Sequence, residues 1–267
     1  DPDAHGDGTV LPMIDYEQPM PEEIDAAYAA RSGSFFDRGS AVMMASTHSA
    51  RQLYRMTEEQ PGAVAAARWY LNVAQYWAWR LSGVAVSEVT AMGAQSHLWN
   101  VPERRFAPIV GAMDWGRLMP PFAPAWTELG PVRQEIAARY GIAPGMAVHA
   151  GVHDSSASFY RYLAAGLRDF TVISTGTWIV ALSDHADLTM LDERFGVTIN
   201  ADVHGRAVGG ALTMGGREFS SIAGEGWRGA RADAGTISRL IGRGTMALPS
   251  FGSNDGQFPG SAGRGRI

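Results

Sequence analysis

The chain has 267 residues, of which 46% are hydrophobic and 18% are charged, and its formal net charge at pH 7 is −5. These values are typical of a globular protein with one large domain or two modest ones, and the negative charge disfavours a nucleic-acid or acidic-membrane surface. All 22 basic residues are arginines and cysteine is absent, which excludes a Walker A loop, a Schiff-base lysine, a disulfide and a cysteine-ligated zinc within this chain. Because there is no run of about 18 apolar residues and no signal-peptide pattern, we expect a cytoplasmic protein.

Both ends of the chain have an unusual composition. Residues 1–10 are polar and lack a starting methionine, and residues 253–267 are rich in glycine. We therefore expect the chain to be an internal piece of a longer protein.

In chain order, the first patterned segment is LPMIDYE (11–17), a short apolar run that ends in acidic and aromatic residues. Between Pro61 and Gly83, apolar residues recur at spacings of three and four, which predicts one amphipathic helix that ends at Gly83. The same stretch is rich in aromatic residues, for which a stacking platform for bases or sugars is one interpretation and core packing the favoured one: Trp69, Tyr70, Tyr76, Trp77 and Trp79.

The middle of the chain predicts further helices. Residues 87–100 follow, with Ser87 as the expected N-cap of a helix. Residues 101–130 are rich in proline, and we expect them to wrap the surface. A short helix is predicted over 131–141, closed by Gly141.

The next segments have the patterns of strands as well as helices. MAVHAG (146–151) predicts a buried strand, and SSASFYRYLAA (155–165) predicts a helix with Asp154 at its N-cap. DFTVIST and TWIVALS (169–183) are rich in β-branched residues on either side of Gly176, and GVTINADVHGRAVGGAL (196–212) has a similar pattern, so each predicts a hairpin. MGGREFSSIA then predicts a helix that begins at a double glycine, and this alternation of strands and helices indicates an α/β protein.

Two motifs are weak indications of function. GEGWRG (224–229) satisfies the dinucleotide pattern G-x-G-x-x-G, but it follows a helical stretch rather than a strand, so we interpret it as a turn. Three histidines and an aspartate could be pictured as metal ligands, but they lack helical spacing and a denser cluster, so structural roles are favoured. They are His149, His153, Asp154 and His204.

Asp154 has two interpretations that its local sequence leaves open. Aspartate is favoured at helix N-caps because it accepts hydrogen bonds from free backbone N–H groups. Alternatively, Gly151 lets the backbone approach another group closely, and a carboxylate at a strand-to-helix junction can take a proton.

The predicted hairpin tip has the composition of a phosphate-binding turn. Ser174, Thr175, Gly176 and Thr177 would present hydroxyls and successive backbone N–H groups in one turn, an arrangement that binds phosphate oxygens without a lysine. Taken alone, the stretch is more typical of a plain β-turn. An aspartate at a strand end, then a helix, then this hairpin about twenty residues later would place a base and a phosphate cradle around one cleft.

This order of motifs resembles the FGGY family of carbohydrate kinases. GVHDSSASF (151–159) is similar to the Gly-x-x-Asp motif of that family's catalytic base, and STGTW (174–178) to its phosphate hairpin. LPMIDYE is similar to a segment near the sugar, although Asp15 replaces its tryptophan. Two longer stretches match further motifs of the family: RWYLNVAQYWAWRLSGVAVSEVT (68–90) and GGALTMGGREFSS (209–221). The family's first Asp-Gly-Thr phosphate loop and its late Gly-Gly adenosine motif have no counterpart here.

The resemblance implies an α/β, actin-like (ribonuclease H-like) two-domain sugar kinase fold that is present in part. Residues 1–166 would form the C-terminal part of the first, sugar-binding domain. Residues 167–267 would form the first part of the second, nucleotide-binding domain, with the boundary near Gly166.

The resemblance also implies a function. The protein would transfer the γ-phosphoryl group of ATP, bound with Mg²⁺, to a ketose such as a deoxyhexulose or a pentulose. Asp154 would be the catalytic base. Nucleotide phosphates would be held by Ser174, Thr175, Gly176, Thr177, Gly216 and Ser220. Sugar contacts would come from Tyr16, Glu17, Gln95, His97, His153 and Asp154.

The expected partners are therefore a sugar and ATP, with no nucleic acid and no membrane, and the family resemblance is compatible with a homodimer. Two other functions stay open at this point. An actin-like nucleotide-binding scaffold or regulator would need no base in a Gly-x-x-Asp motif. An α/β hydrolase would require a metal or a serine elbow, and neither is evident in the sequence.

Overall fold

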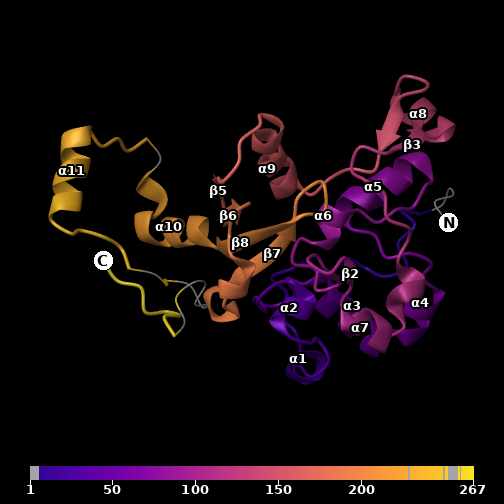
Figure 1. Ribbon diagram of the computed structural model, residues 1–267, viewed down its shortest axis with the longest axis horizontal. Coiled ribbons are helices and arrows are strands. Elements are labelled where there is room, and N and C mark those ends of the chain that lie inside the picture. Colours follow the sequence, from indigo (N-terminus) through magenta and orange to yellow (C-terminus); the bar gives the residue numbers. More distant parts are fainter. Residues whose placement is uncertain (1–5, 228, 249, 252–257, 259) are drawn as a thin grey trace.

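The computed structural model describes residues 6–227, 229–248, 250–251, 258 and 260–267. The chain forms a mainly helical N-terminal part and a second part built on a four-stranded sheet (Figure 1). The N-terminal part contains α1 (Glu22–Ala29), α2 (Phe35–Arg38), α3 (Ser49–Glu59), α4 (Pro61–Ala66), α5 (Val73–Ser82), α6 (Val89–Met92), α7 (Pro108–Ala112), the 3-10 helix η1 (Trp115–Leu118), α8 (Gln134–Tyr140), and two antiparallel strand pairs, β1 (Trp99–Asn100) with β2 (Arg105–Phe106) and β3 (Glu128–Pro131) with β4 (Ala147–His149).

The largest hydrophobic core lies in the N-terminal part and includes residues that we expected at the surface. Ile109, Val110, Trp115 and Leu118 are buried in it together with α1 and α3 residues such as Tyr28. The prediction that 101–130 wraps the surface was therefore wrong for residues 101–120, whereas none of residues 121–130 is buried. Proline ends helices, but it does not keep the apolar residues around it out of a core.

The helix predicted from Pro61 to Gly83 is in fact two helices, α4 and α5. Between them Ala67 is extended, and the Tyr70 N–H donates to the Leu118 carbonyl at 2.8 Å instead of to a helical partner. The aromatic residues divide accordingly. Trp79 is buried, as core packing predicts, but Trp77 is 59% exposed.

Three local predictions in this part had different outcomes. Gly141 does end α8, in a left-handed conformation. However, the N-cap of α6 is Glu88 and not Ser87, because the Glu88 carboxylate accepts from the N–H groups of Thr90 and Ala91. The predicted buried strand is β4, in which only the central Val148 is buried.

The second part is organised around an antiparallel sheet of order β5-β6-β8-β7. Both predicted hairpins are confirmed: β5 (Thr171–Thr175) with β6 (Ile179–Ser183), and β7 (Val197–Ala201) with β8 (Ala207–Thr213). Phe159 and Leu163 of α9 (Asp154–Ala164) pack on Leu182 and Val208 of this sheet. The remaining elements are η2 (Leu188–Met190), η3 (Glu193–Phe195), α10 (Gly215–Ala223), η4 (Glu225–Trp227) and α11 (Ala234–Gly242).

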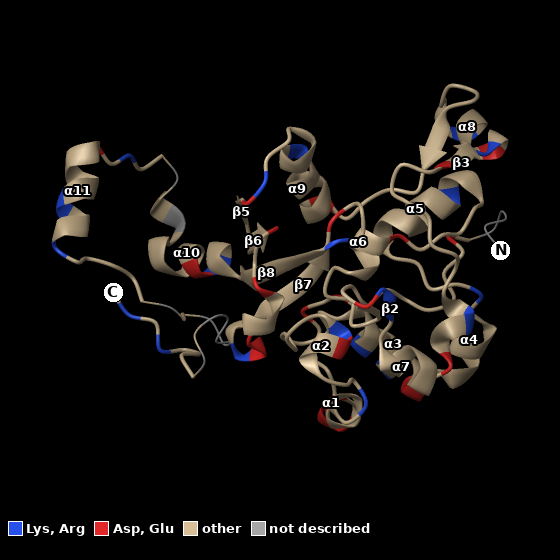
Figure 2. Ribbon diagram, in the orientation of Figure 1, with Lys and Arg blue, Asp and Glu red and all other residues tan. Residues whose placement is uncertain are grey.

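The glycine-led helix is confirmed as α10. The GEGWRG stretch follows it, with Gly224 after the last residue of α10 and η4 next, while Arg228 lies outside the described residues. Strands β5 to β8, all of them described, carry no charged residue (Figure 2). Charge around this sheet therefore comes from loops and helix ends.

A short segment of the N-terminal part extends the sheet. Ser40 forms an antiparallel bridge with Thr198 of β7, the Ile199 N–H donates to the Gly39 carbonyl at 2.7 Å, and the Ala41 N–H donates to the Val197 carbonyl at 3.0 Å. Backbone pairing thus fixes how the two parts meet. In the portion of the chain that is described, none of the helices is both long and apolar enough to cross a bilayer.

Candidate active-site cleft

The β5–β6 hairpin tip and the start of α10 are in direct contact. The Gly216 N–H donates to the Thr177 carbonyl at 3.2 Å. A Cβ atom at position 216 would overlap the carbonyl oxygen of Gly176 and lie 2.8 Å from the Thr177 Cα, so only glycine fits there without displacing the hairpin. The structure therefore joins the two glycine-containing motifs that the sequence separates by about forty residues.

The hydroxyl groups of these motifs face different environments. Ser174, Thr175 and Thr177 are exposed at the hairpin tip, where their hydroxyls are accessible to a ligand. Ser220 is also exposed, but its hydroxyl donates to the Gly216 carbonyl at 3.0 Å, one turn earlier in α10. Its oxygen lone pairs are still able to accept a hydrogen bond.

The segment LPMIDYE reaches the same place from the other end of the chain. The Tyr16 ring lies 6.4 Å, centroid to centroid, from the ring of Trp178, the residue after Thr177. Glu17 accepts from the Arg217 guanidinium at 2.5 Å, directly after Gly216. Tyr16 and Glu17 thus lie beside the hairpin tip and the first turn of α10.

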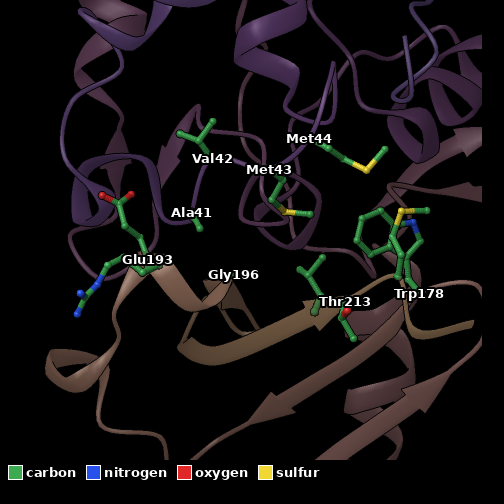
Figure 3. A pocket seen from close by; sticks show the side chains of 11 residues that line it. Ala41, Val42, Met43, Met44, Trp178, Glu193, Gly196 and Thr213 are labelled. Atoms are coloured by element: carbon green, nitrogen blue, oxygen red, sulfur yellow. The ribbon is translucent and has the colours of Figure 1, made fainter. Parts of the chain in front are cut away.

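A cavity of about 290 Å³ lies next to these residues, between the two parts of the chain. Figure 3 shows Met43 and Met44 of the N-terminal part on one side and Trp178 and Thr213 of the sheet on the other. The remaining lining residues are Ala41, Val42, Glu193, Arg194, Gly196, Leu212 and Met214.

The charged groups of this cavity are compensated by protein partners. The Glu193 carboxylate pairs with the buried Arg38 guanidinium, and the Arg194 guanidinium pairs with Asp192. The rest of the lining is mainly apolar. Such a cavity suits an uncharged ligand with an apolar face better than it suits a phosphate group.

Asp154 begins α9 but does not cap it, which corrects one of its two interpretations. The N-cap is His153, and Asp154 is the first helical residue. Its side chain is 94% exposed, accepts from the Ser155 N–H at 2.6 Å and lies 3.4 Å from the His153 Nε2. A carboxylate at this position interacts favourably with the helix dipole and is accessible to a ligand.

The start of α9 is held at the end of the sheet away from the hairpin tip. The Ser156 hydroxyl donates to the carbonyl of Ala201, the last residue of β7, at 3.1 Å. In the sheet register, Ala201 pairs with Ala207, at the end opposite to the one where Ile179 pairs with Thr213. Asp154 and the hairpin therefore belong to opposite ends of the same sheet.

The other expected sugar contacts, Gln95, His97 and His153, are not among the residues that line the cavity. His97 is only 1% exposed, and both of its ring nitrogens lie 2.7 Å from protein partners, the Tyr28 and Ser40 hydroxyls. Its ring also stacks on His48 with centroids 3.6 Å apart. Burial lowers the pKa of His97 well below its usual value, and neutral imidazole is consistent with this enclosed position.

Gln95 contacts the sheet, and His153 directly precedes α9. The Gln95 Nε2 donates to the Asn200 side chain of β7 at 3.3 Å. The His153 N–H donates to the Thr90 hydroxyl at 2.9 Å. Burial lowers the pKa of the His153 ring, although the Asp154 carboxylate opposes this effect.

Several residues at the cleft have no distinctive sequence signal. Trp178 and Arg217 follow the glycine motifs directly, so the sequence could have placed them near a site. Their contacts with Tyr16 and Glu17 could not have been predicted from it. Met43 and Met44 lie in a segment without a motif. Among the described residues, no group of three or more His, Asp or Glu side chains is arranged to hold a metal ion.

Comparisons with known proteins give matches to both parts of the chain. Residues 22–160 match the N-terminal domain of the FGGY family of carbohydrate kinases, and residues 167–266 match the "Carbohydrate kinase FGGY, C-terminal domain". The structure is similar to that of a carbohydrate kinase from Novosphingobium aromaticivorans, with 33% identity and a TM-score of 0.80, over 97% of this chain and 57% of that one.

Two further proteins are more distantly similar to this chain. A xylulose kinase from Rhodospirillum rubrum aligns with 17% identity and a TM-score of 0.59, over 87% of this chain and 47% of that one. L-fuculokinase from Escherichia coli is 26% identical over 172 residues, 62% of this chain and 36% of the enzyme. The chain thus spans little more than half the length of the carbohydrate kinase structure. With both domain matches in the expected order, the chain has part of the actin-like fold of sugar kinases and belongs to the FGGY family of carbohydrate kinases.

Proposed function

We propose that the protein containing this chain transfers the γ-phosphoryl group of ATP to a hydroxyl of a sugar. The observation that carries the proposal is the contact of Gly216 with the backbone of Gly176 and Thr177, because it unites a hydroxyl-bearing turn with a helix N-terminus. Helix N-termini and turns with successive N–H groups are sites at which proteins bind phosphate oxygens.

The nucleotide phosphates would be held by groups at this contact. Ser174, Thr175, Gly176 and Thr177 provide the hairpin tip, and Gly216 and Ser220 provide the first turns of α10. Since the chain has no lysine, an arginine must supply any side-chain cation from within it, and Arg217 is placed to do so. A magnesium ion bound with ATP would neutralise charge on the phosphate oxygens during transfer.

Asp154 would act as the general base. Its exposed carboxylate can accept the proton of the attacking sugar hydroxyl as the phosphoryl group is transferred. Because Asp154 and the hairpin lie at opposite ends of the sheet, the sugar and the phosphates would have to bridge them. Closure of the two domains about a boundary near Gly166 would exclude water from the reacting groups.

The acceptor would be a ketose such as a deoxyhexulose or a pentulose. The similarity to L-fuculokinase and the compensated, mainly apolar cavity between Met43, Met44 and Trp178 support an uncharged substrate with an apolar face. Tyr16, Glu17, Gln95 and His153 would contribute hydrogen bonds to its hydroxyls. His97 would not touch the sugar directly, because its ring is enclosed and both of its nitrogens have protein partners.

The proposal is tested by ADP release from the complete protein that carries this chain, with ATP, Mg²⁺ and a panel of ketoses and aldoses. We expect one or a few ketoses to stimulate ADP release strongly, and the Asp154→Asn variant to lose this stimulation. ATP binding without phosphorylation of any sugar would instead identify a nucleotide-binding scaffold of the same fold.

A further inference from the structure

The loop that precedes Asp154 is held from the N-terminal part at both of its ends. At the first end, the Nε2 of Gln75, a residue of α5 that is only 1% exposed, donates to the Ala150 carbonyl at 3.0 Å. The same nitrogen is 3.5 Å from the Gly151 carbonyl. Gly151 has φ +84°, and a Cβ there would lie 3.4 Å from the Ala74 Cβ, so the loop packs closely on α5.

At the second end, the loop is held by a short chain of hydrogen bonds that starts in α6. The His153 N–H donates to the Thr90 Oγ1 at 2.9 Å, and the Thr90 hydroxyl donates to the Glu88 Oε2 at 2.5 Å. Since the hydroxyl proton points at the carboxylate, a lone pair of Oγ1 is left to face His153. Glu88 therefore fixes the direction of the hydrogen bond that holds the loop.

Glu88 is an unusual choice for this position. Its side chain is completely buried, and burial raises the pKa of its carboxyl group. Its Oε2 also accepts from the Thr90 and Ala91 N–H groups at 3.0 Å, as an N-cap does. However, serine or asparagine would cap a four-residue helix without burying an ionisable group. The carboxyl group is accounted for if it also orients Thr90.

Asp154 depends on this loop because its own side chain has few contacts. The carboxylate is 94% exposed, and its partners are the adjacent residues Ser155 and His153. Where this carboxylate lies is thus decided by the backbone at 150–154. The first turn of α9 is held on its other side by the hydrogen bond from Ser156 to the Ala201 carbonyl.

We propose that Gln75 and the Glu88–Thr90 pair are positioning residues that hold the Asp154 backbone where the carboxylate can accept a proton from the substrate. The inference rests on the proposed kinase function and adds to it the groups that keep the base in place. They do not touch the substrate, so they act only through Asp154.

The test uses the complete protein with Thr90→Val, which keeps the shape of the side chain and removes the hydroxyl. We expect kcat to fall about 10-fold or more, because misplacement of a catalytic group by about 1 Å can cost up to 100-fold, while KM for ATP stays unchanged. Thr90→Ser keeps the hydroxyl and should restore most of kcat. Thr57→Val is the matched control, since the Thr57 hydroxyl contacts Leu53 and Trp115, away from this loop.

Two further measurements distinguish positioning from a general structural role. In an Asp154→Asn background, Thr90→Val should have almost no additional effect on kcat. A residue that acts only by positioning the Asp154 carboxylate has no effect on turnover once that carboxylate is removed. Amide hydrogen exchange at His153 should become faster in Thr90→Val and remain slow in Thr57→Val.

The possible results are separable. If the wild-type protein phosphorylates no sugar, the proposed function fails. If Asp154→Asn is inactive but Thr90→Val and Gln75→Met both turn over normally, the positioning role is overturned while the kinase function stands. If Thr90→Val does not fold, Gln75→Met decides alone, because it removes the donor at the other end of the loop and should lower kcat with KM for ATP unchanged.

Discussion

Glu17 and Arg217 are 200 residues apart in the chain and form an ion pair of 2.5 Å between the N-terminal segment and the first turn of α10. Both side chains are more than one-third exposed, so the pair contributes little to folding stability. Its consequence is geometric. It holds the Arg217 guanidinium against the segment that carries Tyr16, whose ring lies beside Trp178 and thus near the proposed phosphate site.

Arg217→Gln should therefore affect nucleotide recognition rather than folding. In the complete protein we expect KM for ATP to rise roughly 10-fold, as loss of a charge-assisted hydrogen bond would produce, with an unchanged melting temperature. Trp178→Ala is the matched comparison, because it removes a wall of the cavity and should raise KM for the sugar instead. Equal effects of both variants on both substrates would contradict the separation of the two subsites.

Asp154→Asn should separate catalysis from structure. The side chain is exposed and does not cap α9, so the melting temperature should stay as in the wild type. Since an amide cannot accept the proton, kcat should fall about 100-fold or more, while KM for the sugar changes much less. Measuring kcat and melting temperature on one preparation checks both statements, and near-normal turnover would remove Asp154 from the mechanism.

The two glycines of the proposed phosphate site should respond differently to substitution. A Cβ atom at Gly176 would make only an ordinary van der Waals contact, with the Trp178 carbonyl oxygen 3.7 Å away. Gly176→Val should therefore fold normally and raise KM for ATP more than KM for the sugar. An unchanged KM for ATP would mean that the tip is an ordinary turn.

At Gly216, even one methyl group overlaps the hairpin backbone. Gly216→Ala should consequently lower the melting temperature as well as ATP affinity, because the hairpin or α10 has to shift. Thermal melts with and without ATP distinguish this result from that of Gly176→Val. A fully stable Gly216→Ala variant would show that the contact is not needed for folding.

The buried histidine pair predicts a loss of stability in mild acid. Burial lowers the pKa of His48 to about 3, so below its usual value of 6.5 the unfolded chain takes up a proton that the folded chain does not. Stability should thus decline as the pH falls from about 6.5 towards 3, and His48 alone accounts for about 2 kcal/mol between pH 7 and pH 5.

Urea unfolding at pH 7 and pH 5 measures this effect. His48→Gln should flatten the difference between the two pH values, even if it lowers stability at both. His185→Gln, which removes a half-exposed ring, should keep the wild-type difference. An unchanged pH dependence in His48→Gln would assign the acid sensitivity to other groups.

Local patterns in the sequence were sufficient for the elements whose structure depends on neighbouring residues. The two hairpins, the helix closed by Gly141 and the glycine-led α10 are set by β-branched runs, turn residues and the spacing of glycines. The family was also accessible at this level. Its motifs are short stretches in a defined order, and both domain matches confirm it.

Long-range packing decided where helices break and which polar residues are buried. The sequence from Pro61 to Gly83 is periodic enough for one helix, but Tyr70 pairs with the Leu118 backbone and divides it. His97 and Glu88 are polar residues in polar-looking stretches, yet both are buried because partners from distant segments enclose them. Burial and pairing depend on which surfaces meet in three dimensions, and a window of a few residues does not contain that information. For the same reason, the cavity at Met43 and the hydrogen bonds that hold the Asp154 loop were found only in the tertiary structure.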